Sequence, residues 1–220
     1  MFSDGSTVFE FRGPFGVPIQ ISSTFLMLAF FIVFVGGGMS NLPYQIAFVA
    51  MIFVSILAHE LGHAWGCIVQ GIPVERILIH GGGGYCLPAR QPARLQDEFI
   101  VALGPIVNLG LWAIASLLVP FMADPLLYWG LSLFALINLF LAVMNMIPVM
   151  PLDGGKLFQY GLRRFMDNDQ ARRVAGGVGV VIAILWIPAM IYFYIYLGFI
   201  LLFFPSIRVH WQMLNSTDQG

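Results

Sequence analysis

Long apolar stretches separated by short polar segments make up most of the chain. Between Arg12 and His59 no Lys, Arg, Asp or Glu occurs. The segment Gly36–Pro43 divides that stretch, because Gly and Pro both interrupt regular structure. We therefore expect a first helix over about Ile19–Val35 and a second over about Tyr44–Gln70.

The same pattern continues and predicts further helices. Asp124 and Pro125 separate two apolar stretches with a turn, and Pro residues end the second of them. After the second expected helix, the apolar and Gly-rich segment Ile77–Leu87 favours a strand, a turn and a strand at the membrane surface. The further expected helices are about Asp97–Phe121, Leu126–Ile147 and a short amphipathic helix over Gly155–Met166.

Residues 174–207 hold no charged residue and permit two interpretations. A single helix over this stretch would be about 50 Å long at 1.5 Å per residue, which exceeds the roughly 30 Å hydrocarbon core. Pro188 can break it into two short spans. We favour two spans, which makes six in all, and keep a single kinked helix as the alternative.

The composition supports a membrane protein. Hydrophobic residues make up 59% of the chain and charged residues 10%, whereas soluble domains are about half apolar and a quarter charged. The sequence predicts an all-α polytopic membrane protein with about six transmembrane helices and a small Gly-rich β element. The first twenty residues do not resemble a cleaved signal peptide, so we expect the first span to be retained.

Charge and cysteine content narrow the functional classes further. The net charge of −1 does not indicate nucleic acid as a partner. Cys67 and Cys86 lack the Cys-x-x-Cys spacing of a metal site, and we interpret both as ordinary small residues.

The basic residues predict how the chain crosses the membrane. With six spans, all ten of them fall on one side, and the loops of the other side hold none. Basic residues stay cytoplasmic. We therefore expect both termini, the C-terminal end of the second helix and the PLDGG segment to face the cytoplasm. Five spans would leave Arg208 on the other side.

The sequence HELGH at His59–His63 places ionisable groups inside the second expected helix. Such groups are costly in a bilayer and indicate function. Residues four apart share a helix face, so His59 and His63 can bind one zinc ion, and Glu60 can accept a proton from a water on that ion. The alternative is a pair of buried histidines that are hydrogen-bonded within a helix bundle.

A catalytic zinc site needs a third protein ligand. The candidates are Asp153, Glu75, His80, Asp97 and Glu98. We favour Asp153, which follows Pro148 and Pro151 where a helix should end, because irregular backbone at membrane depth lines protein or a watery cavity. Asp153 could instead only cap the next helix. We expect His80 to be an interface residue and assign His210, in the tail, no role.

These motifs resemble the site-2 protease family of intramembrane zinc metalloproteases. The family combines HExxH with a later N-x-x-P-x-x-x-x-D-G-type motif, matched here by Asn145, Pro148, Asp153 and Gly154. ALGPIVN (Ala102–Asn108) is similar to its small-Gly-Pro-x-x-Asn element, and the segment Gly81–Gly84 is similar to its membrane-associated β region. The resemblance covers about Ile19–Met166.

The resemblance implies hydrolysis of peptide bonds within or next to transmembrane segments of other proteins, in regulated intramembrane proteolysis. The implied site consists of one zinc ion on His59, His63 and Asp153, the catalytic base Glu60, and Asn145 in contact with substrate or the tetrahedral intermediate. A side-chain amide is a suitable donor to a developing oxyanion. Interhelical hydrogen bonding is the alternative role for Asn145 and the favoured role for Asn108.

The substrate would be a transmembrane protein within the lipid bilayer. A helix hides its amides, so the substrate must unwind, and pairing with an edge strand is one way to hold the extended peptide. We hypothesise that the segment Ile77–Leu87 supplies this edge, with Ile77, Ile79 and Gly82 as the candidate positions.

Many family members carry a PDZ or a nucleotide-sensing CBS domain, and this sequence leaves no residues for either. We therefore expect a minimal form, in which regulation is absent or comes from a separate protein. We expect a single membrane-embedded metalloprotease domain over residues 1–220, with a core over 19–166 and C-terminal helices over 171–207.

Three alternatives to this function differ in sequence features that can be checked. Membrane zinc proteases of the prenyl-processing type use a downstream Glu as third ligand, and no Glu follows Glu98. A membrane zinc-binding protein without protease activity would have a closed site, which needs no base such as Glu60. A transporter would show an internal repeat or paired broken helices, and neither is present.

Overall fold

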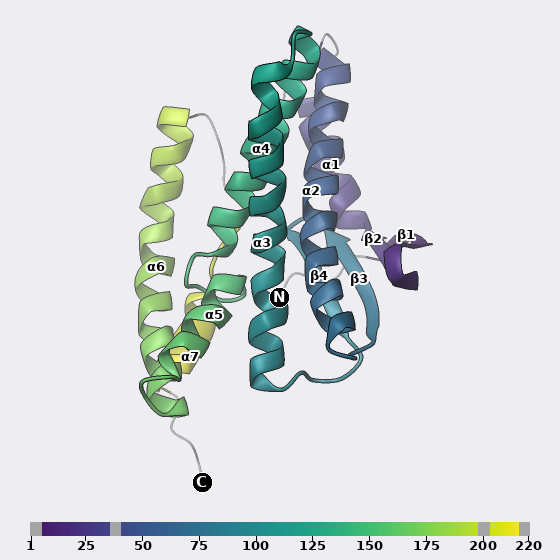
Figure 1. Cartoon of the computed structure of the whole chain (residues 1–220). Coiled ribbons are helices and arrows are strands. Elements are labelled where there is room, and N and C mark those ends of the chain that lie inside the picture. The colour runs from purple at the N-terminus through teal and green to yellow at the C-terminus, as the bar shows by residue number, and fades with distance from the viewer. Residues whose placement is uncertain (1–5, 36–40, 198–202, 216–220) are drawn as a thin grey trace. The chain divides into compact units, whose positions relative to one another are not determined.

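The structure is a computed structural model that describes residues 6–35, 41–197 and 203–215 (Figure 1). The chain divides into two compact units, residues 1–143 and 144–220. Most of the break expected at Gly36–Pro43 lies outside the described residues.

Four helices of the described chain are long and apolar enough to cross a membrane. A fifth apolar helix, Ser23–Phe34, is shorter. The expectation of a largely helical membrane protein with a small β element is therefore confirmed, whereas six membrane-spanning helices are not.

The first unit holds most of the expected helices. They are α1 (Ser23–Val35), α2 (Leu42–Val69), α3 (Arg94–Leu118, continued by the 3-10 turn η3, Val119–Phe121) and α4 (Pro125–Asn145), whose last residues belong to the second unit. Asp124 begins α4 as predicted: its Oδ1 accepts hydrogen bonds from the backbone N–H groups of Leu126 and Leu127 at 2.9 and 3.0 Å.

A four-stranded sheet accompanies these helices. Its strands are β1 (Thr7–Arg12), β2 (Pro18–Ser22), β3 (Val74–His80) and β4 (Gly83–Pro88), in the order β1-β2-β3-β4. β1 and β4 run antiparallel to their neighbours, and β2 runs parallel to β3. The predicted strand, turn and strand are present as β3 and β4, while β1 and β2 were not expected.

Two sequence expectations need correction here. The first helix begins at Ser23 instead of Ile19, because residues 18–22 form strand β2, in which Ile19–Ile21 pair with β3. The three candidate positions for a substrate edge are also misplaced, although the segment Ile77–Leu87 does include the edge strand β4. Ile77 and Ile79 pair with β2 on one side and β4 on the other, and Gly82 lies in the turn between β3 and β4, so none of the three lies on an open edge.

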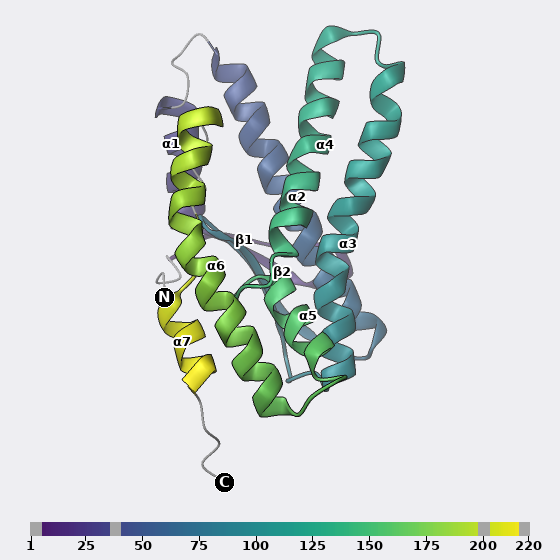
Figure 2. The same ribbon diagram turned by 90° about the vertical axis from the view of Figure 1, so that its left-hand side faces the viewer.

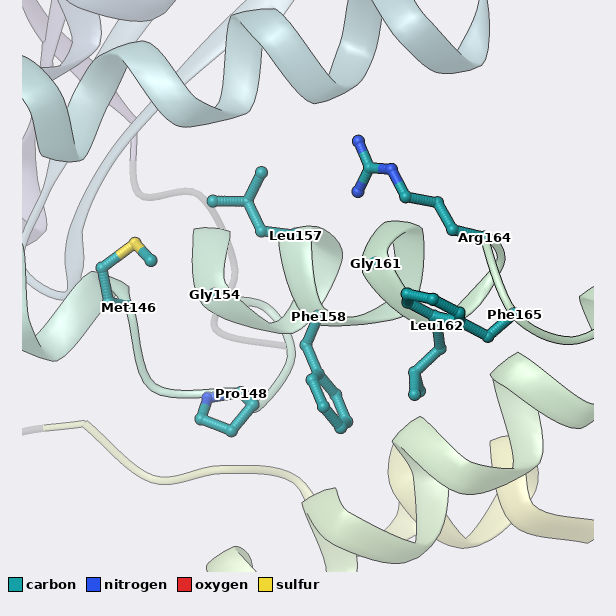
Figure 3. A pocket seen from close by; sticks show the side chains of 9 residues that line it. All are labelled: Met146, Pro148, Gly154, Leu157, Phe158, Gly161, Leu162, Arg164 and Phe165. Atoms are coloured by element: carbon teal, nitrogen blue, oxygen red, sulfur yellow. The ribbon is translucent and has the colours of Figure 1, made fainter.

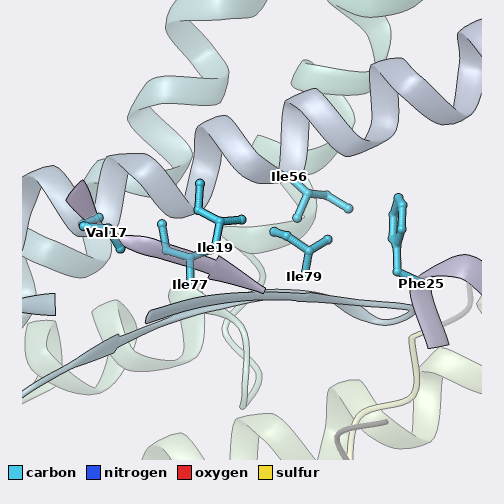
Figure 4. Close-up of a cluster of buried hydrophobic side chains, with 7 residues drawn as sticks. Val17, Ile19, Phe25, Ile56, Ile77 and Ile79 are labelled. Carbon is cyan, nitrogen blue, oxygen red and sulfur yellow. The ribbon is translucent and has the colours of Figure 1, made fainter. Parts of the chain in front are cut away.

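The core of the first unit lies between the sheet and α2. Figure 4 shows Ile19, Ile77 and Ile79 side by side on the sheet, with Ile56 of α2 above them. The three sheet residues are fully buried. Burial of an isoleucine side chain contributes about 1.5–3 kcal/mol. This packing fixes the sheet against the helix that carries HELGH.

The second unit consists of α5 (Asp153–Leu162), α6 (Asn168–Leu197) and α7 (Ile207–Asn215). The favoured break at Pro188 is wrong, because α6 continues through this residue. Proline removes one backbone hydrogen bond, but helices in membranes tolerate it where neighbouring groups compensate. The alternative of one long helix therefore holds for residues 168–197.

The described residues after α6 lie beside that helix and include no further helix long enough to span a membrane. The indole N–H of Trp186 donates to the carbonyl oxygen of Phe203 at 2.7 Å, and residues 203–206 form neither helix nor strand. Both views show α7 beside α6 (Figures 1 and 2). Arg208 consequently lies along the half of α6 that carries Arg172 and Arg173.

Candidate metal centre

Two histidines of α2 form the middle of the candidate site. His59 and His63 are 6% and 9% exposed. Their Nε2 atoms lie 3.1 Å apart, and their rings are nearly perpendicular, at 86°. A spacing of four residues places both side chains on one face of the helix, one turn apart.

The second ring nitrogen of each histidine is held by an oxygen atom of α3. His59 Nδ1 lies 2.6 Å from Asn108 Oδ1, and His63 Nδ1 lies 2.8 Å from the carbonyl oxygen of Ile100. Carbonyl and amide oxygens only accept hydrogen bonds, so each Nδ1 carries the proton in this arrangement. Both Nε2 atoms then present lone pairs.

Two lone pairs at 3.1 Å repel each other unless a cation lies close to both. A proton on one ring or a divalent ion bound by both nitrogens removes the repulsion. Metal-binding histidines commonly have the other ring nitrogen fixed by an oxygen acceptor, which sets the tautomer and the ring orientation. The donor set and its hydrogen bonds therefore fit a zinc ion.

A buried chain of polar side chains supports His59 from three helices. The amide nitrogen of Asn108 donates to Asn138 Oδ1 at 2.8 Å and to the carbonyl oxygen of Ser55 at 3.2 Å. The amide nitrogen of Asn138 donates to Ser55 Oγ at 3.0 Å and to the carbonyl oxygen of Phe134 at 2.9 Å. These donations leave Asn108 Oδ1 as the acceptor for His59.

Sequence reasoning provided no indication of Asn138 and Ser55, whereas the interhelical hydrogen bonding favoured for Asn108 is present. All three residues are fully buried. The available signal was a set of polar residues in apolar helices, where such groups tend to be paired or functional.

Glycines let the helices approach the two histidines. A Cβ at Gly104 of α3 would lie 2.6 Å from His59 Nε2 and 2.5 Å from His63 Nε2. A Cβ at Gly62 of α2 would lie 2.8 Å from the carbonyl oxygen of Leu103. Small residues at these positions allow close packing of α2 on α3 and keep the space beside both Nε2 atoms open.

Glu60 lies between α2 and the edge strand of the sheet. It is 4% exposed, and a Cβ at Gly84 of β4 would lie 2.8 Å from its Oε1. Among the described strands, β4 pairs only with β3. Gly84 thus leaves room for the Glu60 carboxylate beside β4, which forms one edge of the sheet.

The other acidic and histidine candidates of the first unit lie elsewhere. Glu75 is exposed on β3, and His80 Nδ1 accepts the backbone N–H of Gly82 at 3.1 Å. Asp97 and Glu98 lie near the start of α3. Within the described part of the first unit, no carboxylate, thiol or imidazole completes a group of three ligands with the two histidines.

The two cysteines are free thiols, with Cys67 buried and Cys86 partly buried. A hydrogen bond with the Cys67 thiol and then burial raise the pKa of Cys86 well above its ordinary value. A thiol that stays protonated is a poor metal ligand. This agrees with the interpretation of Cys86 as an ordinary small residue.

In the second unit, a tight loop leads to Asp153. Asn145 is the last residue of α4, and Asp153 is the first residue of α5, with Leu152 at the N-cap position. A Cβ at Gly154 would lie 2.6 Å from the carbonyl oxygen of Ile147. The loop therefore folds back directly onto the start of α5, which only glycine permits at this position.

The loop and α5 line an open, apolar hollow of about 640 Å³. Figure 3 shows Met146 and Pro148 of the loop on its border, together with Leu157 and Phe158 of α5. Arg164 is the one charged residue that lines it. The surface next to Asp153 is thus predominantly apolar.

Comparisons with known proteins agree with these motifs. The family model described as peptidase family M50 matches residues 47–127 and 126–187. A zinc metalloprotease of Methanocaldococcus jannaschii is 29% identical, over 77% of this chain and 50% of its own length. A Synechocystis relative is 30% identical, over 75% of this chain and 48% of its own length. The chain spans about half the length of these curated relatives.

A solved structure shows the same fold. The site-2 protease from Methanocaldococcus jannaschii has a TM-score of 0.64 and 25% sequence identity, and the match covers 94% of this chain and 91% of that one. The resemblance inferred from HELGH and the Asn145–Gly155 motif is thereby confirmed. The chain belongs to peptidase family M50.

Proposed function

We propose that this chain is an intramembrane zinc endopeptidase that hydrolyses peptide bonds within or next to transmembrane segments of substrate proteins. The observation that carries the proposal is the pair of buried Nε2 atoms 3.1 Å apart, with both Nδ1 atoms held by oxygen acceptors. This arrangement lies inside a helix that is long and apolar enough to cross a membrane.

The ligands of the single zinc ion are His59, His63 and Asp153. The absence of a third ligand beside the two histidines among the described residues of the first unit supports a ligand from the second unit. Asp153 is the acidic residue of the family motif and begins a helix directly after a tight loop. Two imidazoles and a carboxylate suit zinc, with one position left open for water.

When bound, zinc supplies a Lewis acid for the scissile carbonyl and lowers the pKa of a water. Glu60 accepts the proton of the attacking water and passes it to the leaving nitrogen. Asn145 donates a hydrogen bond from its side-chain amide to the substrate oxygen as negative charge develops on it. The buried surroundings of Glu60 keep competing water away from this transfer.

The substrate segment binds in extended form along the edge of β4 (Gly83–Pro88). Most of β4 lies within the segment Ile77–Leu87 that was expected to supply the edge, although the candidate positions Ile77, Ile79 and Gly82 lie outside β4. Support comes from the sheet order and from the close approach of Gly84 to the Glu60 carboxylate. An added strand gains backbone hydrogen bonds that an unwound transmembrane segment would otherwise lack.

The two units act together as one protease domain over residues 1–220, because each contributes zinc ligands. The chain is an integral membrane protein with its termini toward the cytoplasm, which the one-sided distribution of basic residues supports. Its partners are a transmembrane protein substrate and the lipid bilayer. Regulation by a separate protein stays a prediction.

The test compares wild type with Glu60→Gln, using purified protein in detergent and a panel of single-span substrates. We expect both proteins to hold one zinc ion, and we expect the variant to cleave on the order of 10²–10⁴-fold more slowly. If both hold zinc and cleave at the same rate, Glu60 is not the base. If both hold zinc and neither cleaves any substrate, the alternative of a zinc-binding protein without protease activity is favoured.

A further inference from the structure

His210 of α7 is a buried histidine in the C-terminal tail, outside both motifs. It is 1% exposed. Its Nδ1 lies 2.8 Å from the carbonyl oxygen of Ser206, and its Nε2 lies 2.9 Å from the backbone nitrogen of Met150. Residues 60 positions apart in the sequence are thus joined through one imidazole.

These two contacts fix a single form of the ring. The Ser206 oxygen only accepts, so Nδ1 carries the proton, and the Met150 N–H only donates, so Nε2 carries the lone pair. The neutral imidazole satisfies both partners at once. A buried backbone N–H that lost its acceptor would destabilise the loop.

The Met150 amide belongs to the loop that leads to Asp153. Several backbone N–H groups of this loop donate hydrogen bonds to carbonyl oxygens of the loop itself or of the last turn of α4. These donations run from Ile147 to Met144, from Val149 to Ile147, from Leu152 to Val149 and from Gly155 to Leu152. Pro148 and Pro151 have no N–H to donate. Met150 instead donates to a side chain of α7, so His210 ties the loop to another helix.

The same peptide group also contacts the start of α5. A Cβ at Gly155 would lie 2.7 Å from the carbonyl carbon of Val149 and 2.9 Å from the nitrogen of Met150. The Val149–Met150 peptide is therefore held between His210 and Gly155. Because Gly155 is two residues from Asp153, this peptide packs directly on the first turn of α5.

Glycines of α6 provide the space for His210. A Cβ at Gly179 would lie 2.6 Å from both Cγ and Nε2 of the ring, and a Cβ at Gly176 would lie 2.8 Å from the carbonyl oxygen of His210. Gly177 differs, since its Cβ would only meet a Leu214 methyl group at an ordinary 3.6 Å. The backbone of α6 at Gly176 and Gly179 thus packs closely against His210 and also restricts the position of its ring.

We propose that His210 is a positioning residue that holds the Val149–Met150 peptide so that the Asp153 carboxylate is presented to zinc. The inference rests on the proposed function, in which Asp153 is the third ligand. His210 touches neither the ion nor the substrate in this account. It acts on zinc binding through the backbone of the loop and the start of α5.

The test measures zinc affinity by competition with a chelator, together with the cleavage rate at saturating zinc. His210→Phe retains an aromatic ring but cannot accept from Met150, and we expect zinc affinity to fall about 10- to 100-fold. Because the zinc ligands and Glu60 are intact, excess zinc restores most of the cleavage. His210→Gln offers an amide oxygen to Met150 and should regain most of the affinity.

A matched pair on α6 tests the same claim without changing the histidine. Gly179→Ala pushes against the ring and should weaken zinc binding, whereas Gly177→Ala adds the same methyl group next to Leu214 and should leave it unchanged. The proposal is overturned if His210→Phe and Gly179→Ala bind zinc as wild type does. It is also overturned if excess zinc fails to restore their cleavage. If wild type itself binds no zinc, the proposed function has failed instead.

Discussion

At the scale of single residues, the histidines depend on neighbours that their motif does not contain. Asn108 fixes the tautomer of His59, and Asn138 and Ser55 fix the orientation of Asn108. A fully connected buried polar network stabilises one arrangement of its members. Zinc affinity should therefore respond to substitutions that never touch the ion.

Asn108→Ala should lower zinc affinity about 10- to 100-fold, because His59 loses the acceptor that orients its ring. Asn138 lies one hydrogen bond further from His59 than Asn108 does. Asn138→Ala keeps the hydrogen bond from Asn108 to the Ser55 carbonyl oxygen, so its effect on zinc affinity should be smaller. Competition with a chelator measures both. Equal affinities for wild type and Asn108→Ala would show that the network is only structural.

Gly104→Ala should abolish zinc binding or reduce cleavage on the order of 100-fold, because the new methyl group would lie 2.6 Å from His59 Nε2 and displace the ring. Gly110→Ala, on the same helix, is the matched control, since no atom lies within 4 Å of its Cβ. Zinc content and cleavage rate are measured for both. Similar losses in the two variants would point to a general effect on α3.

The HELGH spacing predicted the pairing of His59 and His63, because four residues make one helical turn. The partners of the rings could not be predicted in this way. Asn108 and Asn138 lie 49 and 79 residues after His59 in the sequence, and only helix packing brings them together. His210 was missed for the same reason, since its contact with Met150 depends on the return of the chain along α6.

At the scale of elements, apolar periodicity placed the long helices and was ambiguous for short segments. Residues 19–22 continue the apolar run of α1, so sequence alone assigned them to the helix, yet they belong to strand β2, and residues 19–21 pair with β3. A short apolar run does not distinguish a buried strand from a helix. Pro188 was overinterpreted as a break, because a membrane helix tolerates proline.

The edge of β4 should bind substrate through backbone hydrogen bonds. Synthetic substrates that carry an N-methyl group at one of two successive amides beside the scissile bond test this. One of the two amides faces the strand, and its methylation should reduce kcat/KM about 2- to 10-fold, the value of one hydrogen bond. Methylation of the other amide serves as the control. Equal rates for both substrates would contradict strand pairing.

At the scale of the whole molecule, the distribution of basic residues supports the proposed orientation in the membrane. The basic residues near α5, at the start of α6 and in α7 belong to one cytoplasmic group in the proposed topology. Six spans were expected because a sixth helix would bring Arg208 to the cytoplasmic side, with the other basic residues. In the structure, residues 203–206 form no helix, and Phe203 contacts Trp186 of α6. The segment that carries Arg208 therefore lies beside α6 without a sixth span among the described residues.

Single cysteines at two exposed positions report this orientation. In a background with Cys67→Ala and Cys86→Ala, Asp124→Cys should react with a membrane-impermeant maleimide in right-side-out vesicles, and Arg164→Cys should react only after permeabilisation. The reason is that the proposed topology assigns the loop before α4 and the basic segment to opposite sides of the membrane. The reverse labelling pattern would invert the proposed topology.

The position of the cut tests the central claim most directly. Zinc-loaded enzyme and a panel of single-span substrates are reconstituted together in lipid vesicles, and mass spectrometry identifies the product termini. The account predicts zinc-dependent cuts within the transmembrane segment or immediately next to it, where HELGH lies inside an apolar helix. Cuts confined to soluble parts of the substrates, or the absence of any cut despite full zinc occupancy, would contradict an intramembrane protease.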